Sequence, residues 1–142
     1  MAEISLTKAK KIIATAFAKG KEAGFKPLSV VVVDAGGHVK AFERQDGAAP
    51  GRFEIAFGKA HGCVMLGMTG TALRDRAEQQ AYFITAAGSA YDGKMIPVPG
   101  GVLVRDKKGD VIGGVGVTGD TSENDAVAAV AGIEAVNLTA DA

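Results

Sequence analysis

Two short stretches with the same spacing constrain most of the expected sheet. The pattern D-x-x-G-x-V occupies residues 34–39 and again residues 106–111. Each copy lies between two stretches typical of strands, and a short connection that contains a glycine is typical of a β-hairpin. The repeat therefore predicts an antiparallel sheet built largely from two similar hairpins. Any antiparallel sheet can reuse this turn chemistry, so the repeat does not by itself indicate a duplication.

Residues 28–33 are the stretch most typical of a buried strand, because four consecutive valines follow Leu28 and Ser29. Successive side chains of a strand point to opposite faces of the sheet, so both faces of this strand need a cover. We expect helices on one face and either another subunit or a ligand on the other.

Helical periodicity fills the rest of the chain between glycine-rich breaks. The expected helices run from a cap at Ser5–Thr7 to a stop at Gly24, over 53–64, from about Thr71 through Ile84 to a loop at 88–93, and over about 122–136. The expected strands are 28–33, 38–44, 101–105 and 111–117.

Length and charge exclude several classes of protein. The 142 residues predict one domain over 1–142. Lys plus Arg and Asp plus Glu both number 16, so no excess positive charge favours nucleic acid or an anionic membrane. No apolar run is long enough for a membrane span, and the first residues lack the pattern of a signal peptide, so a cytoplasmic protein is expected. One cysteine, Cys63, and two histidines argue against a disulfide and against CxxC or His-rich metal sites, and no metal is expected.

The glycine-rich stretch 97–125 carries the most informative local signal. Seven of the 20 glycines lie between Gly100 and Gly119, but the spacing is not that of a phosphate-binding loop. Gly114 and Gly116 leave one face of a strand without side chains, and Gly113 leaves a gap on the opposite face. A crossing helix or a neighbouring subunit can fill this space, and so can a flat or compact ligand.

The last helix begins among carboxylates. Ser122-x-x-Asp125 resembles a capping box, and Asp120, Glu123 and Asp125 lie where a helix dipole favours negative charge. They disfavour an anionic ligand there. Capping is the simpler interpretation, and the alternative is that one carboxylate faces a ligand hydroxyl or a pocket proton.

His61 and three basic residues are the other candidates for chemistry. His61, on the expected helix 53–64, is either a packing residue, an axial haem ligand or a proton shuttle. Cys63 lies two residues further on, hence on another face of that helix, and His38 is expected to be solvated in its turn. The basic residues nearest the glycine-rich stretch can bind a carboxylate or a propionate, or can be solvated or interface charges. They are Arg44, Arg52 and Lys59.

Several motifs together resemble one family. Residues 33–48, 58–60, 66–68, 97–102, 113–125 and 131–133 are similar to motifs of the GlcG/HbpS-like proteins, and the resemblance runs from about Ser5 to Val136. It implies an α/β (α+β) fold, profilin-like, with an antiparallel sheet of about five strands and flanking helices, assembled as a homo-oligomer. Some members bind haem, among them a secreted haem sensor and the C-terminal domain of PduO-type corrinoid adenosyltransferases. Another is encoded with glycolate oxidation genes.

The motifs and the basic candidates define an expected ligand site between the helix 53–64, the two glycine turns and the last helix. Its expected ligand-binding residues are Asp34, Gly36, Gly37, Arg44, Lys59, His61, Pro99, Gly100, Gly101, Gly116, Gly119 and Asp120. The chain departs from the family pattern in three ways. The first helix lacks the histidine or other ligand that haem-binding relatives use, His61 stands where relatives often have an aromatic residue or Thr, and Ala126 stands where an acidic residue is frequent. The first departure disfavours haem, whereas the second supplies another iron ligand or a different pocket chemistry.

Three functions remain open. The first is a cytoplasmic small-molecule-binding protein with haem as the candidate ligand. The second is a cofactor-independent isomerase or lyase for a small organic acid or an aromatic catabolite, in which Arg44 or Lys59 holds a carboxylate and His61 or Asp125 moves a proton. The third is a structural or accessory oligomeric protein whose glycines serve packing alone.

Overall fold

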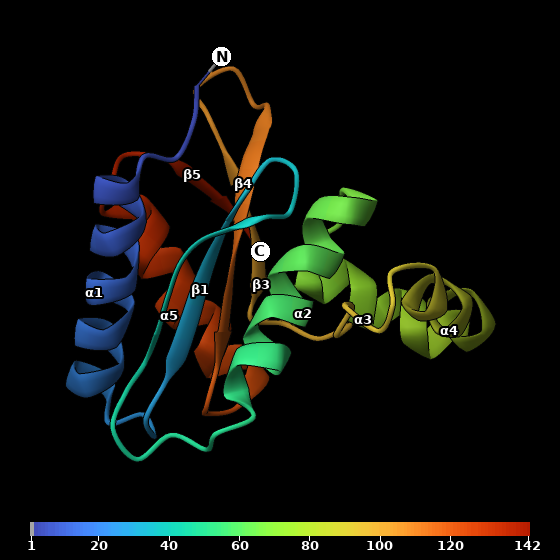
Figure 1. Cartoon of the computed structure of the whole chain (residues 1–142), viewed down its shortest axis with the longest axis horizontal. Coiled ribbons are helices and arrows are strands. Elements are labelled where there is room, and N and C mark those ends of the chain that lie inside the picture. The colour runs from blue at the N-terminus through green and yellow to red at the C-terminus, as the bar shows by residue number, and fades with distance from the viewer. Residues whose placement is uncertain (1) are drawn as a thin grey trace.

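The two predicted hairpins are joined edge to edge in one antiparallel sheet of five strands, in the order β2-β1-β4-β3-β5 (Figure 1). The computed structural model describes residues 2–142. The strands are β1 (Ser29–Asp34), β2 (Val39–Arg44), β3 (Gly101–Arg105), β4 (Val111–Thr118) and β5 (Thr139–Asp141). The helices are α1 (Leu6–Ala23), α2 (Arg52–Leu66), α3 (Gly70–Gln79), α4 (Ala81–Ala90) and α5 (Ser122–Glu134). The predicted α+β architecture is confirmed.

The two hairpin turns have the same hydrogen bonds as well as the same spacing. The carboxylate of Asp34 accepts from the backbone N–H groups two and four residues later, both at 2.9 Å. Asp106 does the same at 2.9 and 3.0 Å. Gly37 and Gly109 have φ values of 81° and 88°, a region that favours glycine. The repeated turn chemistry was therefore predicted correctly.

Strand β1 is covered on both faces by helices of its own chain. Val30 and Val32 pack in the core formed with α1 and α5, whereas Val31 and Val33 pack against α2. Figure 1 shows α1 and α5 on one side of the sheet and α2 on the other. The predicted double burial is confirmed. The expectation that a subunit or a ligand covers one face was wrong, because α2 occupies that position.

Helix α1 has the two ends that the sequence predicts. The Ser5 side chain accepts from the N–H of Lys8 at 3.1 Å, and Gly24 ends the helix at φ 76°. The start of α5 needs a correction. Its N-cap is Thr121, whose hydroxyl accepts from Asn124 N–H at 3.1 Å, so Ser122 and Asp125 do not form the expected capping box.

The expected third helix is two helices, and a strand follows α5. The backbone leaves the helical region at Gln80, where φ is −140°, so α3 ends before it and α4 begins after it. Helix α4 also extends to Ala90, into the stretch expected to be a loop. Figure 1 shows α3 and α4 projecting from the body of the molecule. The short β5 pairs with β3 at the far edge of the sheet, a position that the sequence patterns did not reveal. Within residues 2–142 no helix is both long and apolar enough to cross a bilayer.

Candidate functional site

The glycine-rich strand β4 lies directly under the backbone of α2. A Cβ on Gly116 would overlap the carbonyl oxygen of Ala56, and a Cβ on Gly101 would come within 2.5 Å of the carbonyl oxygen of Lys59. Of the fillers considered for the bare strand face, the crossing helix is therefore the one present. The space expected to hold a ligand between α2, the glycine turns and α5 is occupied by protein atoms.

Lys59 is enclosed beneath α2. Its ammonium group, on a side chain only 4% exposed, donates to the Val117 carbonyl at 2.9 Å and to Asp125 Oδ2 at 3.1 Å. Pro99 and Gly100 are buried, and a Cβ on Gly100 would lie 2.8 Å from Lys59 Nζ and 3.1 Å from Asp125 Cβ. Loss of hydration on burial lowers the pKa of Lys59, and the charge of Asp125 opposes that effect. The Lys59 ammonium is thus committed to an internal ion pair.

Asp125 and Asp120 have opposite environments although they lie five residues apart. Asp125, with a side chain 2% exposed, accepts from Lys59 and from the backbone N–H of Asp120 at 2.9 Å, and burial raises its pKa. Asp120 accepts from the backbone N–H of Lys26 at 2.8 Å, which with the Asn124 amide and the Thr121 N–H lowers the pKa of Asp120 to about 2. The first carboxylate fastens α5 to α2, and the second fastens the segment before β1.

Gly119 completes the attachment of that segment. Its φ is 143°, and a Cβ there would overlap the carbonyl oxygen of Pro27. Gly119 and Asp120, which were expected to contact a ligand, thus hold the backbone at Lys26 and Pro27 in place.

The first hairpin turn lies against the outer face of α2, beside His61. A Cβ on Gly37 would come 2.8 Å from Cε of Met65, 3.0 Å from Cδ2 of His61 and 3.6 Å from its Nε2, so the glycine lets the turn backbone pack closely against this ring edge. Asp34 and Gly36 form the turn itself. The other histidine, His38, has a side chain 81% exposed, as predicted, and its Nδ1 lies 3.3 Å from Asp34.

The His61 ring has one nitrogen engaged and one available. Nδ1 lies 2.8 Å from the backbone carbonyl oxygen of Lys94. Because a carbonyl only accepts hydrogen bonds, Nδ1 carries a proton, and in the neutral ring Nε2 then keeps its lone pair. Metal-binding histidines in proteins are commonly oriented by such a second hydrogen bond.

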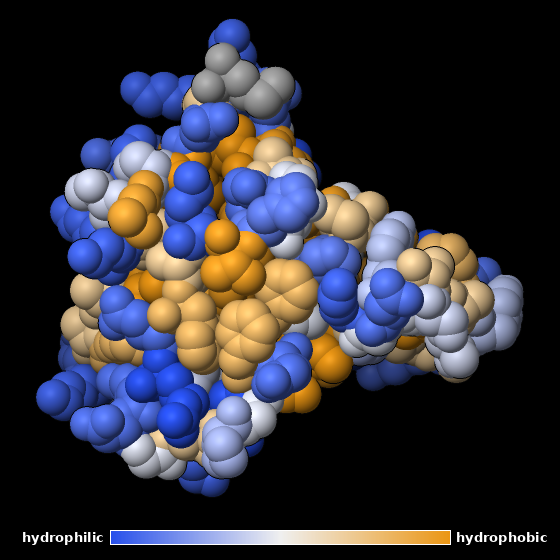
Figure 2. Space-filling model, viewed as in Figure 1, coloured by the Kyte–Doolittle hydropathy of each residue, from blue (hydrophilic) through white to orange (hydrophobic). Residues whose placement is uncertain are grey.

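His61 is one of five rings that follow one another along the surface, and we call this series the aromatic row. Consecutive ring centroids are separated by 4.9, 5.7, 5.1 and 6.0 Å. Its members are Phe42, Phe53, Phe57, His61 and Tyr91, all half-buried. Figure 2 shows a hydrophobic area over β2 and the adjacent part of α2. The spacing of Phe53, Phe57 and His61 by four residues was a signal for this row, whereas the approach of Tyr91 and Lys94 depends on the fold.

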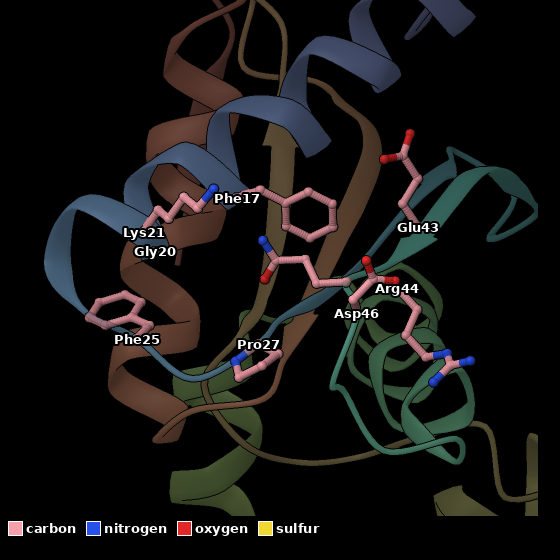
Figure 3. A pocket seen from close by; sticks show the side chains of 9 residues that line it. Phe17, Gly20, Lys21, Phe25, Pro27, Glu43, Arg44 and Asp46 are labelled. Carbon is pink, nitrogen blue, oxygen red and sulfur yellow. The ribbon is translucent and has the colours of Figure 1, made fainter.

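Arg44 lies apart from the aromatic row's histidine, in a groove of about 540 Å³ between α1 and the end of β2 (Figure 3). The Arg44 guanidinium also donates to the Ala48 carbonyl at 2.7 Å. The groove is lined by Phe17, Gly20, Lys21, Phe25, Pro27, Glu43, Arg44, Gln45 and Asp46. Of these residues, the sequence indicated only Arg44 as a candidate. The apolar residues of α1 have the spacing of core residues, and the lining residues at the end of β2 lie far from α1 in the chain.

The thiol and the acidic residues do not suggest a metal site. Cys63 is buried, and burial raises its pKa to about 12, so its thiolate is disfavoured. Among the residues that the structure describes, no three His, Cys, Asp or Glu side chains are grouped to hold a metal ion.

The profile of a family described as "Haem degrading protein HbpS-like" matches residues 4–134. The chain belongs to this family. A comparison of this chain with proteins of curated function gives no significant match.

Solved structures agree with the family in fold. The crystal structure of a PduOC–haem complex is 25% identical and superposes with a TM-score of 0.86, over 99% of this HbpS-like chain and all of the other. A double mutant of Streptomyces reticuli HbpS is 27% identical, with a TM-score of 0.80 over 96% of this chain and 88% of the other. Klebsiella pneumoniae protein ORFY, at 24% identity and a TM-score of 0.84, covers 96% and 93% and shows the same fold.

The two candidate places in this HbpS-like chain differ in their fit to haem. The groove beside Arg44 is lined by no histidine, cysteine, methionine or tyrosine, the usual side chains for haem iron. The aromatic row offers the Nε2 lone pair of His61 between the rings of Phe57 and Tyr91. His61 therefore supplies a side chain of a type that binds haem iron, and the residues of the groove supply none.

Proposed function

We propose that this HbpS-like protein binds haem on the aromatic row, with His61 Nε2 as the iron ligand. The observation that carries the proposal is the hydrogen bond between His61 Nδ1 and the Lys94 carbonyl, which leaves Nε2 free. A bound haem supplies an iron centre for electron transfer or for a further ligand. The haem complex of PduOC supports the choice of ligand class.

The surrounding residues have clear tasks in this proposal. The half-buried rings of Phe57 and Tyr91 offer apolar surface to a macrocycle. Gly37 lets the hairpin turn approach the Cδ2–Nε2 edge of His61 without the clash that a side chain would cause. The exposed ammonium of Lys94 is the cation on this segment for a haem propionate.

A haemin titration of the apo-protein tests the proposal. We expect a saturable shift of the Soret band, and we expect His61→Ala to weaken binding by more than the roughly 10–100-fold typical of losing an outer-shell partner. His38→Ala is the matched control, because it removes the other histidine, an exposed one, and should leave the titration unchanged.

A second variant separates ligation from folding. His61→Gly should bind haemin weakly and recover binding when free imidazole is added. A protein without saturable haemin binding would refute the proposed ligand, and a normal Soret shift in His61→Ala would refute the role of His61 alone.

The enzymatic alternative has less support. Asp125 is paired with Lys59 and shielded from solvent, so its carboxylate does not reach a substrate at the surface. His61 remains a candidate proton carrier. The homo-oligomeric state and the cytoplasmic location expected from the sequence stay predictions.

A further inference from the structure

We propose that the groove between α1 and the end of β2 binds a small zwitterion with an apolar body, in the class of free apolar α-amino acids. This site is separate from the aromatic row and does not depend on haem binding. The groove volume of about 540 Å³ lies within the usual range for small-molecule sites.

The groove has an apolar surface for the body of such a ligand. Phe17 and Phe25 are half-buried, with one side of each packed on the core and the rest open. Figure 3 shows Phe17 and Lys21 on the α1 wall, with Pro27 on the connection that leads from α1 to β1. Phe17, Phe25 and Pro27 supply the apolar part of the lining.

The charges of the groove point to a ligand that carries both signs. Lys21 lies on the α1 wall and Asp46 on the opposite wall, whereas Figure 3 shows the Glu43 carboxylate and the Arg44 guanidinium pointing away from the space between these walls. None of these four side chains forms an ion pair within residues 2–142. Opposite charges therefore line one groove without neutralising each other. The carboxylate of a bound zwitterion would pair with the Lys21 ammonium, and its ammonium would pair with the Asp46 carboxylate.

The groove is held in shape without a ligand. Leu28 N–H donates to the Gln45 side-chain oxygen at 2.7 Å, and Gln45 N–H donates to the Leu28 carbonyl at 3.0 Å. Asp120 fixes the backbone at Lys26 at 2.8 Å. With its oxygen engaged, the Gln45 amide has its N–H donors available to a carboxylate. A preformed site loses less free energy on ordering when a ligand binds.

Calorimetric titration of the full chain with three probes tests the proposal. L-phenylalanine carries both charges, 3-phenylpropionate only the carboxylate, and 2-phenylethylamine only the ammonium. We expect saturable binding of L-phenylalanine and binding at least about tenfold weaker for each of the other two, the effect of losing one charge-assisted contact.

Variants locate the binding. Lys21→Met and Asp46→Asn should each weaken L-phenylalanine binding by about tenfold. Lys11→Met, an exposed lysine on the same helix, is the matched control and should bind normally. Circular dichroism of each variant verifies folding, and in the wild-type protein amide NMR shifts caused by L-phenylalanine should cluster at 17–27 and 43–46.

Three results would overturn the proposal. They are the absence of saturable L-phenylalanine binding, equal binding of 3-phenylpropionate, and NMR shifts outside the groove. Loss of haemin binding in His61→Ala has no bearing on these measurements, so the two proposals fail independently.

Discussion

The two faces of α2 differ in how accessible their polar side chains are. Lys59 and His61 lie two positions apart, which on a helix places them about 200° apart around its axis. Lys59 points to the glycine-rich strand and is sealed in an ion pair with Asp125. His61 points to the aromatic row and keeps Nε2 available. Residue type made both candidates for ligand binding, and the helix face decides which one is accessible.

The largest expected effect comes from breaking the inner ion pair. Asp125→Ala leaves the Lys59 ammonium buried without its counter-ion, so we expect the free energy of unfolding to fall by about 3–5 kcal/mol in urea denaturation. His61→Ala, on the other face, should change it by less than about 1 kcal/mol. Equal losses in the two variants would contradict the division between the faces.

A double variant sharpens the same point. Lys59→Met with Asp125→Leu replaces the pair by apolar side chains of similar shape, and should recover most of the stability lost in Asp125→Ala. If the double variant is as unstable as Asp125→Ala, the loss comes from packing and not from an unpaired charge.

A smaller loss is expected where α2 approaches the glycine strand. Gly116→Ala places a methyl group on the Ala56 carbonyl, and we expect about 1–3 kcal/mol of destabilisation from overpacking. Gly88→Ala is the matched control, because its Cβ meets no atom within 4 Å and alanine favours the helix. Thermal unfolding of both variants should give shifts of opposite sign.

The smallest effect should appear with pH, at Asp120. Its folded pKa of about 2 lies below the ordinary 3.8, so its charged form stabilises the fold above that range and the contribution is lost as the pH falls towards 2. Asp120→Asn should therefore be less stable than the wild type near neutral pH, and the difference should vanish at about pH 2. Urea unfolding across the acid range measures this, and a difference that persists at low pH would point to lost hydrogen bonds instead.

Local patterns predicted most of the fold because each depends on neighbouring residues. The turns at 34–37 and 106–109 use their own carboxylate and glycine, and the caps Ser5 and Gly24 act within one helical turn. The break at Gln80 was missed because no glycine or proline marks it. Asp125 was misread as a cap because its partner, Lys59, lies 66 residues away.

The sequence by itself determined the antiparallel hairpins, the buried valine strand and the membership of the HbpS-like family. Only the tertiary structure decided that α2 fills the glycine strand, that Lys59 meets Asp125, that Lys94 orients His61, and that α1 and β2 enclose a groove. The reason is physical: turns, caps and periodicity depend on residues a few positions apart, whereas burial and side-chain partners are set by the packing of distant segments.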